Sequence, residues 1–113
     1  MQSSFFDALD ALARSAQIRI DRPEGSAHPR FPNVIYPLDY GFLDGTIAAD
    51  GEGVDVFVGS SAGAGVTAVA LTVDAGKRDV EVKVLLDCIP GEIDEVFAFL
   101  SGTLRLGTTI VHR

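Results

Sequence analysis

Three valine-rich runs, separated by short turn segments, occupy residues 54–86 and constrain the fold most strongly. In residues 54–58 and 80–86, valines alternate with other residues, which is the pattern of a strand with one buried face. Residues 66–73 are almost continuously apolar and β-branched, which indicates a buried strand. The alternation places Asp55 and Phe57 on one face of the first strand. It groups four residues of the third strand on the face away from its valines: Asp79, Glu81, Lys83 and Leu85.

Two helices and two further strand segments complete the predicted fold. Residues 3–14 have an apolar stripe at helical spacing, with Ser3 or Ser4 as the N-cap. Residues 90–101 form a second such helix, which begins at Pro90 and ends at Gly102. Residues 18–20 form a short strand, and residues 103–112 form one or two closing strands broken by Gly107. We expect a mainly β, α+β fold: a small, partly closed barrel of about five strands with flanking helices.

Residues 21–53 are rich in proline and glycine but also contain several large apolar side chains. A stretch of this length is too long for an idle connection, so we expect it to be ordered and to carry function. Tyr36 and Tyr40 are expected to be packed aromatics with hydroxyls in water. His28 is expected to hydrogen-bond within the loop.

Composition excludes several classes of protein. The chain has 113 residues and predicts a single domain, residues 1–113. Its net charge of −7 argues against nucleic acid and anionic membrane surfaces as partners. No apolar run is long enough to span a membrane. Cys88 is the single cysteine, which excludes an intrachain disulfide and a cysteine zinc site. We expect it to be a small buried side chain in a cytoplasmic protein.

A glycine-rich segment, residues 63–68, matches the letters of the dinucleotide-binding motif G-x-G-x-x-A. That motif works by opening a helix after a strand, whereas these glycines precede a strand-like run. We therefore predict a hairpin turn here and no dinucleotide site.

Acidic residues gather in two places along the chain. Asp50, Glu52 and Asp55 fall within six residues, the first two in a glycine-rich turn. A solvated Asp-Gly turn is one explanation, but Asp55 stands in a strand, where aspartate is depleted. Asp74 and Asp79 bracket the next turn and should lie opposite each other across two strands, where like charges repel.

A cation between Asp74 and Asp79 would relieve this repulsion. Lys77 or Arg78 is one source, and a divalent metal ion is another. Every candidate ligand in both acidic segments is a carboxylate, with no histidine or cysteine among them. Oxygen ligands of this kind favour magnesium, manganese or calcium over zinc or copper.

Three segments in order resemble the soluble inorganic pyrophosphatase family, and together they cover about residues 18–86. The first is Pro23-Glu24-Gly25-Ser26. The second is Tyr36-Pro37-Leu38-Asp39-Tyr40-Gly41-Phe42, similar to the family's Y-P-x-N-Y-G-F. It continues to Asp50-Gly51-Glu52-Gly53-Val54-Asp55-Val56, similar to the signature D-G-D-P-x-D-V. The third is Asp74 and Asp79, at the family's D-x-x-x-x-D spacing.

This resemblance implies a five-stranded OB-like barrel and the magnesium-dependent hydrolysis of pyrophosphate or a related small phosphoanhydride. By position it implies five Mg²⁺ ligands (Mn²⁺ being possible), which are Asp50, Glu52, Asp55, Asp74 and Asp79. Asp55 and Tyr40 would be catalytic. The residues expected to bind the phosphate-containing ligand are Tyr36, Arg22, Arg30 and Lys83. Since family members form oligomers, the resemblance also implies a homo-oligomer.

The chain departs from the family pattern at several positions. Glu52 and Gly53 replace an aspartate and a proline of the signature, and Glu81 stands where the family has a lysine. A long family hairpin that carries three charged residues is reduced here to residues 27–35. Arg22, Arg30 and Lys83 are the substitutes that this chain offers. Two further hypotheses therefore stand beside the enzyme: a non-catalytic metal- or phosphate-binding module, and a purely structural domain.

Overall fold

The structure is a computed structural model and describes residues 4–113. Along the chain, the elements are α1 (Ser4–Ser15), β1 (Ile18–Arg22), β2 (Asp39–Leu43), β3 (Val54–Val58), β4 (Val66–Asp74), β5 (Asp79–Leu86), α2 (Pro90–Ala98), the π-helical turn η1 (Phe99–Thr103) and β6 (Gly107–His112). Both predicted helices are present. Ser3, a predicted N-cap, lies outside the described residues.

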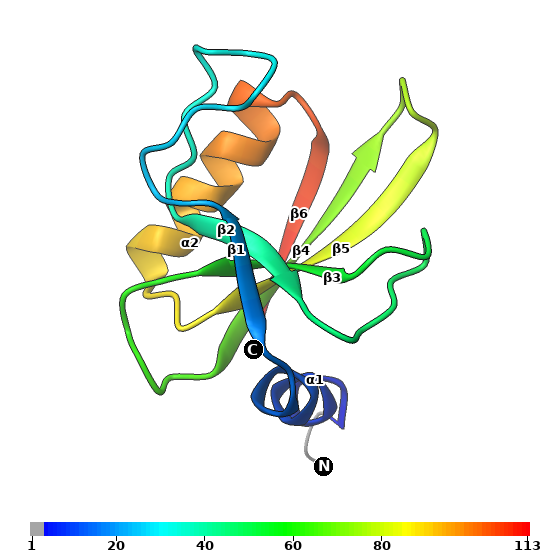
Figure 1. The fold of residues 1–113 in the computed structure, drawn as a ribbon, viewed down its shortest axis with the longest axis vertical. Helices are drawn as coiled ribbons and strands as arrows, with labels where there is room; N and C mark the ends of the chain where they lie inside the picture. Colours follow the sequence, from blue (N-terminus) through cyan, green and yellow to red (C-terminus); the bar gives the residue numbers. More distant parts are fainter. Residues whose placement is uncertain (1–3) are drawn as a thin grey trace.

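The strands form one six-stranded mixed sheet in the order β1-β2-β3-β5-β4-β6 (Figure 1). Only β3 and β5 run parallel among these neighbours, and the other pairs are antiparallel. The prediction of a mainly β, α+β fold is confirmed. The sheet has six strands where the sequence predicts about five, because Asp39–Leu43, within the segment expected to be an ordered loop, forms β2. The sheet has β1 and β6 as its edges and is not closed into a barrel.

The connection between β3 and β4 also differs from the prediction. These two strands are not neighbours: both pair with β5, so residues 59–65 form a crossover loop rather than a hairpin turn. Gly63 and Gly65 adopt φ angles of 88° and 80°, in the left-handed region where glycine is favoured. As predicted, these glycines precede a strand, β4, and not a helix.

The two faces of the sheet have different cores, as the alternation in β3 and β5 predicted. Val56 and Val84 pack with Phe6 and other residues of α1 on one face. Phe57 and Leu85 pack with α2 and η1 on the opposite face, so the helices cover the two sides of the sheet (Figure 1). Cys88 is buried as expected, and burial together with nearby Glu92 and Asp87 raises its pKa to about 12.

Helix α2 begins with a carboxylate that closes its first turn. The Glu92 side chain accepts hydrogen bonds from the backbone N–H groups of Ile89 at 3.0 Å and Ser60 at 3.1 Å. These bonds, the one from Ile89 foremost, lower the pKa of Glu92 despite its burial. The α-helix ends at Ala98, three residues before the predicted end, and continues as the π-helical turn η1. This turn brings Phe99 and Leu100 against the sheet face that carries Asp55.

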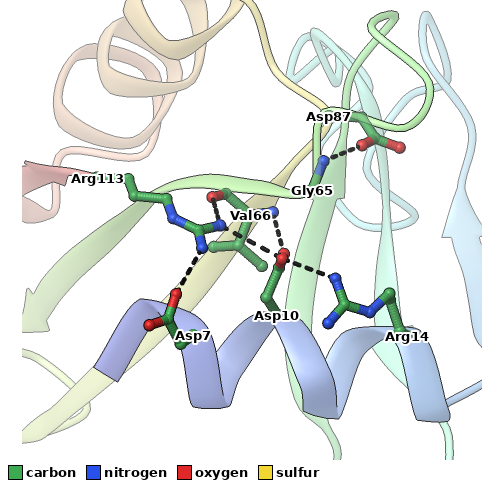
Figure 2. A network of polar contacts seen from close by, with 7 residues as sticks. All are labelled: Asp7, Asp10, Arg14, Gly65, Val66, Asp87 and Arg113. Carbon is green, nitrogen blue, oxygen red and sulfur yellow. Dashed lines mark hydrogen bonds and ion pairs between the residues drawn. The ribbon is translucent and has the colours of Figure 1, made fainter. Parts of the chain in front are cut away.

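A polar network fastens α1 to the start of β4 (Figure 2). The Asp10 carboxylate accepts a hydrogen bond from the Val66 N–H at 2.8 Å and one from Arg14 at 3.0 Å. Arg113, near the chain end, binds the Val66 carbonyl and the carboxylate of Asp7. The helix is thereby held to the sheet by polar contacts as well as by apolar packing. None of the helices in residues 4–113 is both long and apolar enough to cross a membrane.

We expect Asp10→Ala to lower the free energy of unfolding by about 1–3 kcal/mol, because it leaves the Val66 N–H without its partner. Urea denaturation measures the change, with Asp7→Ala as the control. Asp7 makes an exposed ion pair, so its loss should cost less than about 1 kcal/mol. Equal effects of the two variants would contradict this assignment.

The same network makes a pH-dependent contribution to stability. The bond from Val66 and, secondarily, the nearby arginines hold the pKa of Asp10 below its ordinary value. A carboxyl group whose pKa is depressed on folding stabilises the fold above its unfolded-state pKa. This stabilisation is lost as the pH falls through the lower pKa of the folded protein.

Candidate functional site

A cavity of about 540 Å³ opens on the sheet face that carries Asp55. Strands β1 to β5 line it together with the loops after β1 and β2, and η1 closes one side. Six carboxylates line this cavity, which are those of Asp50, Glu52, Asp55, Asp74, Asp79 and Glu81. Its cationic side chains are Arg22, Lys77 and Lys83. With His28 neutral, the lining carries a formal charge of −3.

All of the predicted site residues except Arg30 line this cavity. The five predicted metal ligands therefore meet in one place, as do Tyr36, Tyr40, Arg22 and Lys83. Arg30 is exposed on the loop after β1, where its backbone N–H donates to Nδ1 of His28 at 3.0 Å. This bond matches the expected role of His28 within the loop. Burial, followed by the charges of Arg22, Arg30 and Lys77, lowers the pKa of His28.

The two tyrosines that line the cavity stack on each other. Their ring centroids are 5.4 Å apart, and Tyr36 packs in turn on Phe99 of η1. The Tyr36 hydroxyl accepts a hydrogen bond from Arg22, whose guanidinium also lies over the Tyr36 ring. This contact holds the guanidinium of Arg22, the last residue of β1, at the cavity wall, although Arg22 and Tyr36 are 14 residues apart in the sequence.

Lys83 is a buried cation within the acidic cluster. Its Nζ is 3.0 Å from Oδ2 of Asp55, 3.5 Å from Oε2 of Glu81 and 3.3 Å from the Tyr40 hydroxyl. The Lys83 side chain is only 7% exposed, and that of Asp55 is 25% exposed. Asp55 is therefore not a free carboxylate: the carboxylate predicted to bind a metal ion already holds an ammonium group.

Burial and charge shift the proton affinities of this cluster. Burial works to lower the pKa of Lys83, but the Tyr40 oxygen and the carboxylates of Asp55 and Glu81 outweigh it and raise that pKa. Burial raises the pKa of Tyr40 well above its ordinary value, although Lys83 opposes the shift. Lys83 is thus charged and Tyr40 neutral at pH 7. The pKa of Glu81 is raised by burial and by nearby Asp55 and Asp79, against the opposing charge of Lys83.

Asp50, Glu52, Asp74 and Asp79 complete the acidic lining of the cavity. Asp74 and Asp79 are directly paired across β4 and β5, as their spacing predicted. One oxygen of Asp74 accepts the N–H of Lys77 at 3.1 Å, and one oxygen of Asp50 accepts the N–H of Glu52 at 2.9 Å. These are the bonds of ordinary aspartate turns. Each of these carboxylates has a second oxygen that these bonds do not use.

The six acidic side chains of the cavity offer carboxylate oxygens, which are the ligands that hard divalent cations prefer. Their positions are less favourable: among residues 4–113, no three Asp, Glu, His or Cys side chains are gathered closely enough to hold a metal ion. The carboxylates therefore surround the cavity but do not converge on one point.

Sequence reasoning missed the apolar side of this cavity and the part that Glu81 plays in it. The apolar side is formed by Phe57, Phe99, Leu100, Leu104 and Leu106. The helical stripe in residues 90–101 indicated a buried face but not the π-helical turn that directs it here. For Glu81, the signal was its place on the same predicted strand face as Lys83.

Comparison with known proteins adds no assignment. No protein-family model matches the chain, and no curated protein matches it.

Proposed function

We propose that this chain hydrolyses pyrophosphate or a related small phosphoanhydride with the help of divalent cations, as a short relative of the soluble inorganic pyrophosphatases. One observation carries the proposal. The segments that resemble the family at residues 36–42, 50–56 and 74–79 stand on different strands and loops, yet their tyrosines and carboxylates all line one cavity. An accidental likeness of separate segments would not require them to meet.

The charge of the cavity supports a need for divalent cations. Six carboxylates against three cationic side chains would repel a phosphate anion. Magnesium or manganese held by Asp50, Glu52, Asp74, Asp79 and the remaining oxygen of Asp55 would reverse this balance. When bound, such ions neutralise phosphate charge and lower the pKa of a coordinated water.

The chain's own side chains have separate roles in this proposal. Arg22, anchored on the Tyr36 hydroxyl, would contact phosphate oxygens at the cavity wall. Tyr40, neutral and fixed by Lys83, would orient a water or a phosphate oxygen through its hydroxyl. Asp55, whose side chain is fixed by its contact with Lys83, would bind one divalent cation. Arg30 has no role in this proposal, because it does not line the cavity.

We also propose that the sheet is an opened OB-like barrel. The family resemblance spans residues 18–86, which contain β1 to β5, and these are the five strands that the barrel requires. Strand β6 then extends the sheet beyond β4 as an addition to that core.

Release of inorganic phosphate from pyrophosphate, measured by malachite green, tests the proposed function. We expect phosphate release with Mg²⁺ and none when a chelator removes it. Absence of release with both Mg²⁺ and Mn²⁺ would contradict the enzyme.

One observation favours a second candidate, a non-catalytic module that binds metal ions or phosphate. Asp55, the carboxylate expected to be catalytic, is already neutralised by Lys83. Calorimetry separates the two functions: the module would bind Mg²⁺ or pyrophosphate without releasing phosphate.

We propose that a second copy of the chain covers the exposed apolar side chains of β4, β5 and β6. They lie on the sheet face opposite the cavity and are Leu71, Val73, Val80, Val82 and Val111, between 37% and 67% exposed. An apolar patch of this kind marks an interaction surface.

We expect the chain to sediment as a dimer or a larger homo-oligomer, and Val80→Lys to shift it to monomer. Ile47→Lys is the matched control, because Ile47 is 81% exposed but stands alone in the loop after β2. A wild-type monomer at micromolar concentration would overturn this proposal.

A further inference from the structure

The ammonium group of Lys83 is enclosed by oxygen atoms from three strands. Asp55 on β3 supplies one at 3.0 Å, Glu81 on β5 supplies one at 3.5 Å, and the Tyr40 hydroxyl on β2 supplies one at 3.3 Å. Long-range contacts, not neighbouring sequence, build most of this shell, since Asp55 and Lys83 are 28 residues apart. The shell is therefore a product of the fold.

The other cations of the cavity are placed differently. Lys77 is exposed in the turn between β4 and β5, and Arg22 is engaged by the Tyr36 hydroxyl. Lys83, in contrast, is 6% exposed overall. A buried ammonium is stable only where its charge is matched by nearby oxygen atoms. Here the matching groups are two carboxylates and a hydroxyl, which are also the ligand types that hard divalent cations accept.

We propose that Lys83 is a resident cation of this cavity. Its ammonium occupies the position between Asp55 and Glu81 that a divalent cation would otherwise take, so this part of the cavity works without a metal ion. Divalent cations are then held by the other carboxylates of the cavity, Asp50, Glu52, Asp74 and Asp79, and by the Asp55 oxygen that does not contact Lys83. The proposal rests on the proposed function only in treating the cavity as a cation-dependent phosphate site.

Loss of the Lys83 ammonium should leave a position that a divalent cation can occupy. Replacing Lys83 by methionine removes the charge while keeping most of the side-chain volume. Asp55 and Glu81 then face each other with the Tyr40 hydroxyl and no cation. We expect Lys83→Met to bind one more Mn²⁺ per chain than the wild type, as measured by the electron paramagnetic resonance signal of free Mn²⁺. The melting temperature of the variant should also rise more on addition of Mn²⁺.

Two control variants separate this effect from a general change in charge. Lys77→Met removes the same charge from the exposed part of the cavity and should bind as many Mn²⁺ ions as the wild type. Lys83→Arg keeps a cation beside Asp55 and should also gain none. Thus only loss of the buried charge should create the additional binding position.

The proposal is overturned if folded Lys83→Met binds the same number of Mn²⁺ ions as the wild type. It is also overturned if the variant stays unfolded at saturating Mn²⁺, because the metal ion should then replace the missing ammonium. These outcomes are independent of catalysis. If the wild type releases no phosphate but Lys83→Met gains a Mn²⁺ ion, the proposed enzyme is rejected and the resident cation is supported. If the wild type releases phosphate but Lys83→Met gains no Mn²⁺ ion, the resident cation is rejected and the proposed enzyme is supported.

Discussion

Replacing Asp55 by asparagine is expected to lower kcat/KM for pyrophosphate by about a thousandfold, which corresponds to about 4 kcal/mol. The amide keeps the size of the side chain but not its charge. In the structure this charge anchors the buried ammonium of Lys83 at 3.0 Å, and it faces the cavity that would receive the metal-bound substrate. An uncharged amide can neutralise neither the lysine nor a divalent cation. Phosphate release by the purified variant measures the loss.

Asp44→Asn is the matched control for this prediction. Asp44 makes an ion pair with Arg19 at 3.1 Å, in which both side chains are about half exposed, and it does not line the cavity. Its loss should change the activity by no more than a few-fold. If both variants retained full activity, the cavity would not be the site of reaction.

The stability of Asp55→Asn must be measured alongside its activity. The substitution leaves Lys83 with Glu81 as its remaining carboxylate partner at 3.5 Å. We therefore expect a loss of about 1–3 kcal/mol in the free energy of unfolding, because the buried ammonium exchanges a charged hydrogen-bonding partner for a neutral one. Circular dichroism of the variant under assay conditions separates loss of the fold from loss of the reaction.

The sequence was most informative where the side-chain period of two was regular. The alternation in residues 54–58 and 80–86 placed Asp55, Glu81 and Lys83 on the face away from the valines, and the structure agrees. The opposition of Asp74 and Asp79 also followed from a short turn between two regular strands. In each case local periodicity decides the orientation of the side chain, so no long-range information was needed.

Long-range pairing was the part that local patterns could not supply. Strand β2 follows Pro37 and contains Gly41, both of which are weak signals for a strand. Its identity depends on two neighbours, β1 and β3, that are distant in sequence. The parallel pairing of β3 with β5 was hidden in the same way, because a glycine-rich connection after β3 is typical of a hairpin.

The same limit applies to the candidate site. Residue types and spacing selected the carboxylates and tyrosines, because their chemistry is visible in the sequence. The partner of Lys83 was not visible: a lysine on the cavity face could contact either substrate or a carboxylate, and only the register of β3 against β5 decides in favour of Asp55. Arg30 shows the reverse case, a suitable cation that the loop carries away from the cavity.

Gly41→Ala is expected to destabilise the fold by about 3 kcal/mol, the upper end of the usual cost of overpacking. Gly41 lies in the middle of β2, opposite Ile20 of β1. A methyl group there would overlap the carbonyl oxygen of Arg19 and would stand 2.9 Å from the Cα atom of Ile20. These are backbone atoms of β1, which no side-chain rotation can move. We therefore expect loss of the β1–β2 pairing, measured by urea denaturation and by hydrogen exchange of the β1 amides.

Gly91→Ala is the control, because it makes the same chemical change where space is free. Gly91 lies in the first turn of α2, and no atom outside its own turn lies within 4 Å of the added methyl group. Removing a helical glycine there should stabilise the protein by up to about 1 kcal/mol. If Gly41→Ala were as stable as Gly91→Ala, β1 could not approach β2 as closely as the structure describes. The placement of Arg22 beside Tyr36, which follows from that approach, would then fail with it.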